Sequence, residues 1–431
     1  MKTRCVIIGA GHCGLAMSKY LSDYSIDHVV LERGEIANSW KHERWDSLRL
    51  LTPNWQTRLP GYAYSGDNPD GYMMVTELTG FIENYARTIS APVKQHTRVT
   101  SVTAQDGNYH VATTRGDWQC EALVIASGAC NQAQIPAIAE YAPASVQMLT
   151  PGQYRNPAQL EDGGVLVVGA SATGLQLAEE IHRSGRPVTL AVGEHVRLPR
   201  TYRGKDIQWW MDKLGIFDQR YDEIDDLSRG RNLPSPQLVG SATRESLDLN
   251  RLTATGITIT GRLAGFNESS AQFSGSLGNV CALADLKMDR LLNSIDEWVT
   301  EHEFDNELDP PLRYLRTRIE DSPPLLMDLE RNNIKTILWA TGYRADYSWL
   351  QLPVFDRKGR IRHEGGVVDS HAVYLMGMPL LRRRKSSFIH GAEDDARELS
   401  AELLSRLNSN PESQTDKGAA DGPVRPVHVA A

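Results

Sequence analysis

Apolar runs along the chain repeat one supersecondary unit. Residues 5–8 and 165–168 are short runs rich in β-branched side chains, and each ends at a glycine-containing turn. A stretch with apolar residues at helical spacing follows each turn, and then comes another apolar run, at 27–31 and at 187–191. Short apolar runs bounded by glycine are typical of buried parallel strands. The pattern therefore predicts two units of strand, turn, helix and strand.

A second pair of segments also matches. Residues 123–128 (Leu-Val-Ile-Ala-Ser-Gly) and 337–342 (Ile-Leu-Trp-Ala-Thr-Gly) each read as a strand that ends in a small residue, a hydroxyl residue and glycine. Such an end allows another backbone or a ligand to approach closely. Two dinucleotide-binding folds, each with a glycine turn and a late strand, account for both repeats. We predict an α/β protein with two Rossmann-like domains, the second inserted into the first.

Changes in composition indicate the domain boundaries. The turn-rich stretch 151–164 precedes the second unit, and paired prolines at 310–311 and 323–324 follow it. The expected division is residues 1–158 and 326–408 for the first domain and residues 159–325 for the inserted domain.

The end of the chain follows from the same division. The strand at 336–342 is expected to rejoin the first domain, and a final helix is expected from about Ala392 to Leu407. Residues 409–431 are polar, lack periodicity and are rich in proline, glycine and alanine, so we expect a disordered tail.

Composition narrows the class of protein. The chain has 431 residues, 41% hydrophobic and 23% charged, with a net charge of −8. This mildly acidic chain lacks the basic character of a nucleic-acid binder. No stretch approaches the roughly 18 apolar residues of a membrane span. The first strand begins at residue 5, so cleavage of a secretory leader would destroy it. The five cysteines are also scattered along the chain, and we therefore expect a reducing, cytoplasmic location.

The first glycine turn reads Gly9-x-Gly11-x-x-Gly14, with His12 and Cys13 between the glycines. These glycines permit a tight turn, the approach of a pyrophosphate and close packing of the helix on the strand. Glu32, followed by Arg33, ends the next strand, where a carboxylate accepts hydrogen bonds from a ribose. We therefore predict that an adenine dinucleotide with a free ribose, FAD or NAD, binds here, and we add the late-strand residues Ala126, Ser127 and Gly128 to this site, which we take as the FAD site once NADPH is assigned to the second turn.

The second turn carries Gly169, Ser171, Thr173 and Gly174, with serine in place of the middle glycine. No carboxylate ends the following strand at 192–193, and three arginines come soon after it. They are Arg197, Arg200 and Arg203. Guanidinium groups without a competing acid suit a 2′-phosphate, so we predict NADPH here. Two alternatives stay open: Glu194 reaches a ribose, or the arginines only solvate a loop.

FAD and NADPH together predict hydride transfer to a flavin. A disulfide acceptor would need two cysteines at C-x-x-C or similar spacing, and the chain has none. The sequence also shows no cluster with metal-ligand spacing.

Three motifs now carry a resemblance. The segments Asn38-Ser-Trp40, 44–55 (Arg-Trp-Asp-Ser-Leu-Arg-Leu-Leu-Thr-Pro-Asn-Trp) and 339–343 (Trp-Ala-Thr-Gly-Tyr) resemble those of class B flavin-dependent monooxygenases. That family includes FMO-type, YUCCA-like and N-hydroxylating enzymes, and residues 52–73 look like a bacterial subgroup of it. The resemblance implies activation of O₂ as a C4a-(hydro)peroxyflavin and oxygenation of a small organic substrate at nitrogen, sulfur or a carbonyl carbon.

One expected motif is missing. The family fingerprint Phe-x-Gly-x-x-x-His should stand shortly before the second turn, but residues 141–155 retain only Tyr154 and Arg155 from that region. The departure argues against the Baeyer–Villiger subgroup. It leaves open an FAD-dependent NAD(P)H oxidase or reductase, and also a nucleotide sensor without catalysis. The oligomeric state, a homodimer included, is open as well.

The resemblance also assigns site residues. It implies that Asn54 is a catalytic amide beside the flavin, although asparagine after proline is also common in plain turns. It places several other residues near the cofactors, of which the tryptophans are equally compatible with a core. These residues are Trp40, Trp45, Thr52, Val102, Thr341, Gly342 and Tyr343. Arg383 or Lys385, just before the last helix, would assist at the flavin or belong to a solvated basic run.

Overall fold

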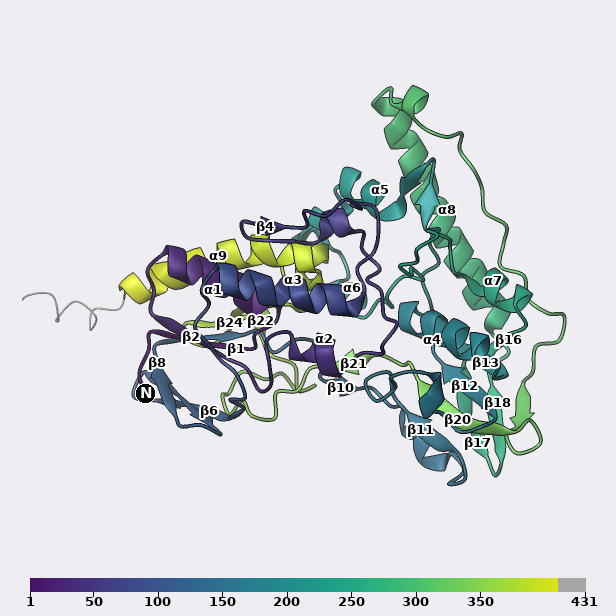
Figure 1. The fold of residues 1–431 in the computed structure, drawn as a ribbon, viewed down its shortest axis with the longest axis horizontal. Coiled ribbons are helices and arrows are strands. Elements are labelled where there is room, and N and C mark those ends of the chain that lie inside the picture. Colours follow the sequence, from purple (N-terminus) through teal and green to yellow (C-terminus); the bar gives the residue numbers. More distant parts are fainter. Residues whose placement is uncertain (410–431) are drawn as a thin grey trace, which may run out of the picture.

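Alternating residues of two central strands organise separate cores. The structure is a computed structural model that describes residues 1–409. In β1 (Cys5–Ile8), Cys5 and Ile7 face one core while Val6 and Ile8 face another. In β12 (Gly164–Val168), Val165 and Val167 are separated in the same way from Leu166 and Val168. This period-2 alternation makes each strand the middle of a three-layer domain, and the two domains form the two lobes of Figure 1.

The first domain contains a seven-stranded sheet. Its strands, in spatial order, are β22 (His363–Glu364), β23 (Val367–Val368), β24 (Val373–Leu375), β9 (Ala122–Ile125), β1, β2 (His28–Leu31) and β5 (Val93–Lys94). From β24 to β5 neighbouring strands are parallel.

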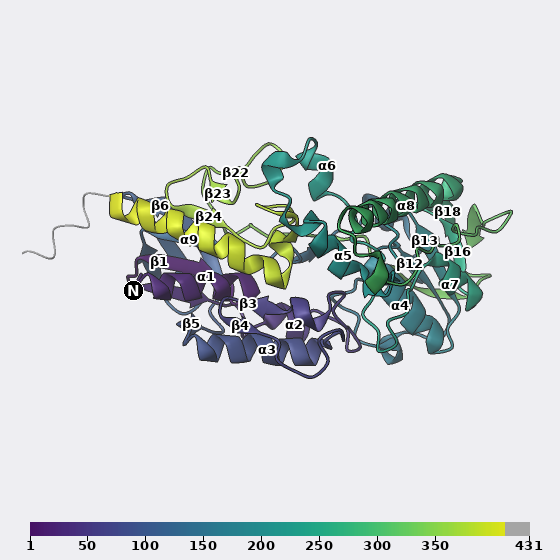
Figure 2. The ribbon, with the colours of Figure 1, turned by 90° about the horizontal axis from the view of Figure 1, so that it is seen from above.

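Different layers cover the two faces of this sheet. One face carries the helices α1 (His12–Asp23), α3 (Val75–Thr88) and α9 (Ala392–Ser409), which lie close together in Figure 2. The other carries an antiparallel sheet of β6 (Val99–Gln105), β7 (Asn108–Thr113) and β8 (Trp118–Cys120).

The second domain repeats these layers. Its five parallel strands, in spatial order, are β11 (Gln147–Leu149), β20 (Ile334–Trp339), β12, β13 (Val188–Val192) and β16 (Thr258–Gly261). One face packs on α4 (Ala172–Arg183), α7 (Leu249–Ala254) and the first turns of α8 (Leu277–Glu301). The other packs on β17 (Leu263–Asn267), β18 (Ser270–Phe273) and β19 (Leu326–Asp328).

The connections between the domains pair with each other. The outgoing strand β10 (Gln132–Ala133) and the returning strand β21 (Tyr343–Arg344) form an antiparallel ribbon. The remaining short elements are α2 (Asn38–His42), β3 (Arg58–Leu59), β4 (Tyr62–Ala63), β14 (Thr201–Tyr202), β15 (Lys205–Asp206), α5 (Ile207–Lys213) and α6 (Leu227–Arg231), and single turns of 3₁₀ helix join several of them.

The predicted insertion of one Rossmann-like domain into another is confirmed, but its boundaries are wrong. The second sheet includes β11 and β20, which both lie outside the expected range 159–325. The strand at 336–342 does not rejoin the first domain, because β20 pairs with β12 in the middle of the second sheet. The tail expected at 409–431 lies outside the described residues, except for Ser409, which ends α9. Among residues 1–409, no helix combines the length and apolarity needed to cross a bilayer.

Candidate functional site

The turn after β1 is built by steric requirements. Gly9 has φ +109°, and a Cβ there would lie 2.4 Å from the carbonyl oxygen of Ala126. A Cβ on Gly14 would lie 2.0 Å from the carbonyl oxygen of Gly9, so α1 packs directly on the turn. Gly11 has nothing within 4 Å of its Cβ position and faces open space. The N-terminus of α1 thus points free backbone N–H groups at a space that a phosphate can enter.

That space is a cavity of about 440 Å³ beyond the ends of β1, β2 and β9. The structure brings together ten of the predicted cofactor residues around it. They are Gly9, Gly11, His12, Cys13, Glu32, Arg33, Trp40, Ala126, Ser127 and Gly128. Distant segments that sequence reasoning missed complete the wall, among them 97–99, Asp346, Trp349 and 376–377. No local sequence signal marked them, because only the fold brings these loops together.

Glu32 is held at the rim of the cavity. Its carboxylate accepts hydrogen bonds from the backbone N–H groups of Ala10, at 2.9 Å, and Gly34, at 3.0 Å, and the residue is 7% exposed. A carboxylate has about four acceptor positions, so it can also accept from the hydroxyls of a ribose.

Two polar atoms in the cavity wall have no partner in the described part of the chain, namely Nε2 of His12 and Oγ of Ser127. Burial lowers the pKa of His12 to about 4, so its imidazole is neutral at pH 7. Buried polar atoms are almost always paired, and a polar ligand in the cavity would pair these. The site therefore fits FAD in its turn, its carboxylate and its free hydrogen-bonding groups.

Two of the predicted flavin contacts are wrong. Val102 is fully buried in β6 and does not line the cavity; Val99, at the start of the same strand, does. Trp45 packs with Leu149 and Tyr154 in the core of the second domain. An apolar residue in a sequence carries no sign of which core it will enter, and here the two cores compete for the same residue types.

The segment that contains Trp45 joins the domains. The side chain of Asn156 donates to Asp46 at 2.7 Å, and Arg200 donates to the backbone oxygen of Leu51 at 2.8 Å. Trp40 does reach the cavity, and the guanidinium of Arg44 lies 5.3 Å from its ring and 5.9 Å from the ring of Tyr343. The Arg-Trp-Asp-Ser-Leu-Arg motif is thus largely an interdomain contact.

The residues after β20 lie at the interdomain ribbon. Thr341 donates to the backbone oxygen of Gln134 at 2.5 Å, and Gly342 has φ +94°. Burial raises the pKa of Tyr343, and the nearby Arg44 opposes that rise. All three residues thus lie beside or in the ribbon that connects the two domains.

Asn54 is buried but does not line the cavity. Its Nδ2 donates to the backbone oxygen of Asn68 at 2.9 Å, while its Oδ1 has no partner among residues 1–409. Nearby, the side-chain polar atoms of Gln56 and the hydroxyl of Thr57 are also buried and unpaired, and Thr52 is partly exposed. This stretch holds more unpaired polar atoms than a plain turn requires, so it remains a candidate contact for a ligand.

The second glycine turn has the geometry of the first. Gly169 has φ +108°, its Cβ would lie 2.4 Å from the carbonyl oxygen of Ala340, and that of Gly174 would lie 1.8 Å from the oxygen of Gly169. Ser171 begins α4 with φ −82° and ψ −175°, where Gly11 begins α1 with φ −82° and ψ −177°. Thr173 follows in the first turn of α4. Serine at the middle position therefore leaves the backbone unchanged.

The arginines expected to bind the 2′-phosphate are bound elsewhere. Arg197 is 4% exposed and forms ion pairs of 2.6 Å with both Asp248 and Asp285. Arg200 is 1% exposed and pairs with Asp206 at 2.5 Å. Arg203 is paired in the same way with carboxylates near α8. A buried guanidinium without a carboxylate is costly, so these side chains stabilise the domain and are not available to a ligand.

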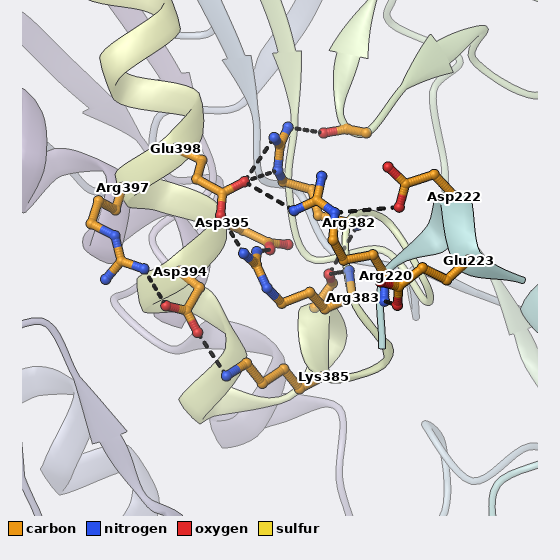
Figure 3. A network of polar contacts seen from close by, with 12 residues as sticks. Arg220, Asp222, Glu223, Arg382, Arg383, Lys385, Asp394, Asp395, Arg397 and Glu398 are labelled. Atoms are coloured by element: carbon orange, nitrogen blue, oxygen red, sulfur yellow. Dashed lines mark hydrogen bonds and ion pairs between the residues drawn. The ribbon is translucent and has the colours of Figure 1, made fainter. Parts of the chain in front are cut away.

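The basic run before α9 is also committed. Lys385 pairs with Asp218 at 2.6 Å and with Asp394 at 2.7 Å. Arg383 binds Glu398 and lies 3.5 Å from Asp395, as Figure 3 shows. Burial raises the pKa of Asp395 to about 6, although the nearby guanidinium groups of Arg383 and Arg382 act to lower it. The run therefore anchors the start of α9, and neither Arg383 nor Lys385 is free to assist at a flavin.

Comparisons with known proteins agree with this architecture. A profile of the pyridine nucleotide-disulphide oxidoreductases matches residues 6–211. The flavin-containing monooxygenase of Stenotrophomonas maltophilia has the same fold, with a TM-score of 0.66 over 94% of this chain and 99% of that one, at 17% identity. YUCCA3 of Arabidopsis thaliana, a probable indole-3-pyruvate monooxygenase, is 26% identical over 50% of this chain and 51% of its own. The chain thus shares its fold with a flavin-containing monooxygenase and is similar in sequence to a class B flavin-dependent monooxygenase.

A bacterial relative specifies the family. The CzcO-like oxidoreductase of Geobacillus kaustophilus, described as uncharacterized, is 30% identical over 402 residues, which cover 93% of this chain and 97% of that protein. The chain belongs to this family of CzcO-like oxidoreductases.

Proposed function

We propose that this protein is an NADPH- and FAD-dependent monooxygenase that oxygenates a small organic substrate at nitrogen or sulfur. One observation carries the proposal: two dinucleotide turns of the same backbone geometry occur in one chain, and they differ in the charge that surrounds them. The first has a buried carboxylate and a large cavity, while the second has no acid at 192–193, where its second strand ends, and Glu194, which comes next, pairs with Lys287.

FAD fits the first turn. The open side of Gly11 would receive the pyrophosphate, and Glu32 would accept hydrogen bonds from the ribose. Bound there, FAD would supply acceptance of a hydride and activation of O₂. The chain would hold the cofactor, exclude water with the walls formed by Trp40 and Trp349, and keep His12 neutral beside the bound group.

NADPH is assigned to the second turn with new ligands for its 2′-phosphate. The side chain of Arg262, which follows β16, passes 3.6 Å from the position of a Cβ on Gly193, just after β13. Within residues 1–409, the guanidinium of Arg262 has no hydrogen-bond or ion-pair partner, and the side chain is exposed. Lys287 lies at the same end of β13, where it pairs with Glu194 at 3.3 Å. These two cations take the role first expected of Arg197 and Arg200.

Disulfide reduction is a poor fit. The five cysteines, all within the described residues, are unpaired, and only Cys13 and Cys130 line the cavity. Burial strongly raises the pKa of the Cys13 thiol, which keeps it protonated and unreactive. A dithiol that exchanges with a substrate would need a second reactive thiol beside a low-pKa one.

An NAD(P)H oxidase or reductase is the second candidate, favoured by one observation. In the region of the missing fingerprint, Tyr154 is fully buried and its hydroxyl donates to Glu180 at 2.7 Å, so this residue stabilises the interdomain region and is not a free ligand contact. The chain therefore lacks the fingerprint histidine and does not offer Tyr154 in its place as a contact for a nucleotide.

Stopped-flow spectroscopy distinguishes the two candidates. The FAD-loaded protein is reduced by NADPH without oxygen and is then mixed with O₂. A slowly decaying spectrum that is neither oxidised nor reduced flavin is expected for a monooxygenase. Direct return of the oxidised spectrum, with stoichiometric H₂O₂ that no substrate suppresses, would contradict the proposal and favour the oxidase. Flavin that NADPH does not bleach would indicate a sensor.

The cytoplasmic location remains a prediction.

A further inference from the structure

One segment of the second domain connects the two nucleotide sites. Residues 214–240 leave α5, pass over the first domain and return to the second turn (Figure 2). On the first domain, the backbone N–H of Tyr221 donates to the backbone oxygen of Arg382 at 3.0 Å. The backbone N–H of Arg384 donates to the backbone oxygen of Gln219 at 3.1 Å. Figure 3 shows the side chain of Arg220 in the same network, 3.7 Å from Glu398. The segment is therefore fixed to the loop that precedes α9.

The other end of the segment is fixed to the second glycine turn. The Nε2 of Gln237 donates to the backbone oxygen of Ala170 at 2.8 Å, immediately after Gly169. The backbone N–H of Gln237 donates to Val196 at 2.7 Å. Gln237 is 1% exposed, yet its Oε1 has no partner within residues 1–409. A buried carbonyl oxygen and a spare N–H thus lie at the turn where a dinucleotide would bind.

The same stretch also reaches the first site. Ser235, two residues before Gln237, lines the cavity of about 440 Å³. Pro234 and Pro236 flank it and restrict the backbone, and Pro236 pairs with Val196 in a β-bridge. Because the stretch is short and stiff, a shift of Gln237 moves Ser235 as well.

We propose that Gln237 binds the pyridine nucleotide through its carboxamide, and that the stretch 235–237 couples occupancy of the second turn to the wall of the flavin cavity. The inference rests on the proposed function, since it needs a nucleotide at Gly169. A nucleotide there offers hydroxyl and amide N–H donors to the free Oε1, and the hydrogen bond would hold the segment against both domains.

The test is a titration of FAD-loaded protein with NADP⁺, followed by the flavin absorbance. Gln237→Met keeps the side-chain length and removes both polar atoms, and we expect NADP⁺ to bind about tenfold more weakly. Gln208→Met is the matched control, because Gln208 is also 1% exposed with an unpaired Oε1 among residues 1–409, but it lies on α5 and does not hydrogen-bond to the second glycine turn as Gln237 does. The control should bind NADP⁺ as the wild type does.

Each outcome has one meaning. Equal affinity in the wild type and Gln237→Met would overturn the inference, as would an equal loss in Gln208→Met. A wild-type protein that responds to no pyridine nucleotide would overturn the proposed function itself. Thermal unfolding without nucleotide reports the cost of losing the hydrogen bond from Gln237 to Ala170, whereas a binding role appears as a smaller additional stabilisation by NADP⁺ in Gln237→Met than in the wild type.

Hydrogen exchange of the wild type tests the coupling without any substitution. NADP⁺ should slow amide exchange in residues 227–240 and in the facing loop 380–387, in addition to the turn at 169–174. Slower exchange confined to the turn would contradict the coupling.

Discussion

The two domains differ less in backbone than in what surrounds it. Gly9 and Gly169 have φ of +109° and +108°, and each would place a Cβ 2.4 Å from the carbonyl oxygen of the residue that follows the late strand. The first turn, however, lies beside a buried carboxylate, whereas the second strand of the inserted domain ends without one. The two turns thus share one backbone geometry, and the side chains at the end of the next strand are what distinguishes them.

A second contrast concerns arginine. In the second domain, Arg197 and Arg200, which follow β13 in the sequence, are buried against carboxylates. Arg262, which follows the neighbouring strand β16, is exposed. Proximity along the chain therefore did not identify the exposed guanidinium at this edge, because adjacent parallel strands end at the same edge of a sheet and bring distant residues there.

The largest expected effect separates the two turns by the same substitution. Gly9→Ala should lose about 3 kcal/mol or more of stability and fail to retain FAD, because the new Cβ overlaps Ala126. Gly169→Ala should keep its FAD but no longer be reduced by NADPH. Flavin absorbance and anaerobic bleaching measure both. Gly61→Ala, with φ +68° but no neighbour within 4 Å, is the control and should cost about 1–2 kcal/mol. Equal loss of FAD from Gly169→Ala would remove the functional distinction between the turns.

A smaller effect tests the selection of the nucleotide. Arg262→Ala should weaken the use of NADPH by about 1.5–3 kcal/mol, roughly ten- to a hundredfold, and leave NADH nearly unaffected. Arg197→Ala should instead lower the melting temperature, because it leaves the buried Asp285 and the partly buried Asp248 without this cation. The measurement is kcat/KM of the wild type and of Arg262→Ala with NADPH and with NADH. Equal losses with the two cofactors would refute the role of Arg262.

The smallest effect concerns acid. Burial lowers the pKa of His390, in the first domain, to about 3. The pKa of this histidine in the unfolded chain is near 6.5, so below that pH the unfolded chain binds a proton that the folded chain does not bind. The stabilisation that comes from the neutral His390 is therefore present in full above pH 6.5 and is lost as the pH falls. His390→Phe keeps the packing on Phe217 and Phe388, at 5.4 and 5.5 Å, and should reduce the loss between pH 7 and 5 by about 1–2 kcal/mol. Urea unfolding at pH 7 and at pH 5 measures this loss of stability in the wild type and in the variant. An unchanged pH dependence in His390→Phe would contradict the lowered pKa of His390.

The sequence by itself determined the repeat. Strands at 5–8 and 165–168, their glycine turns, the helices that follow and the acid at Glu32 are local features, and local periodicity and turn chemistry are readable from neighbouring residues. The same holds for the final helix, which begins at Ala392 as expected.

Only the tertiary structure decided the rest. It placed β20 in the second sheet, Trp45 in the second core and Val99 at the cavity, and it brought Ser235 to the cavity and Gln237 to the second glycine turn. The physical reason is that burial and ion pairing depend on which surfaces meet. In a chain with two similar cores, apolar and charged residues have two compatible destinations, and the sum of their packing and desolvation energies selects one.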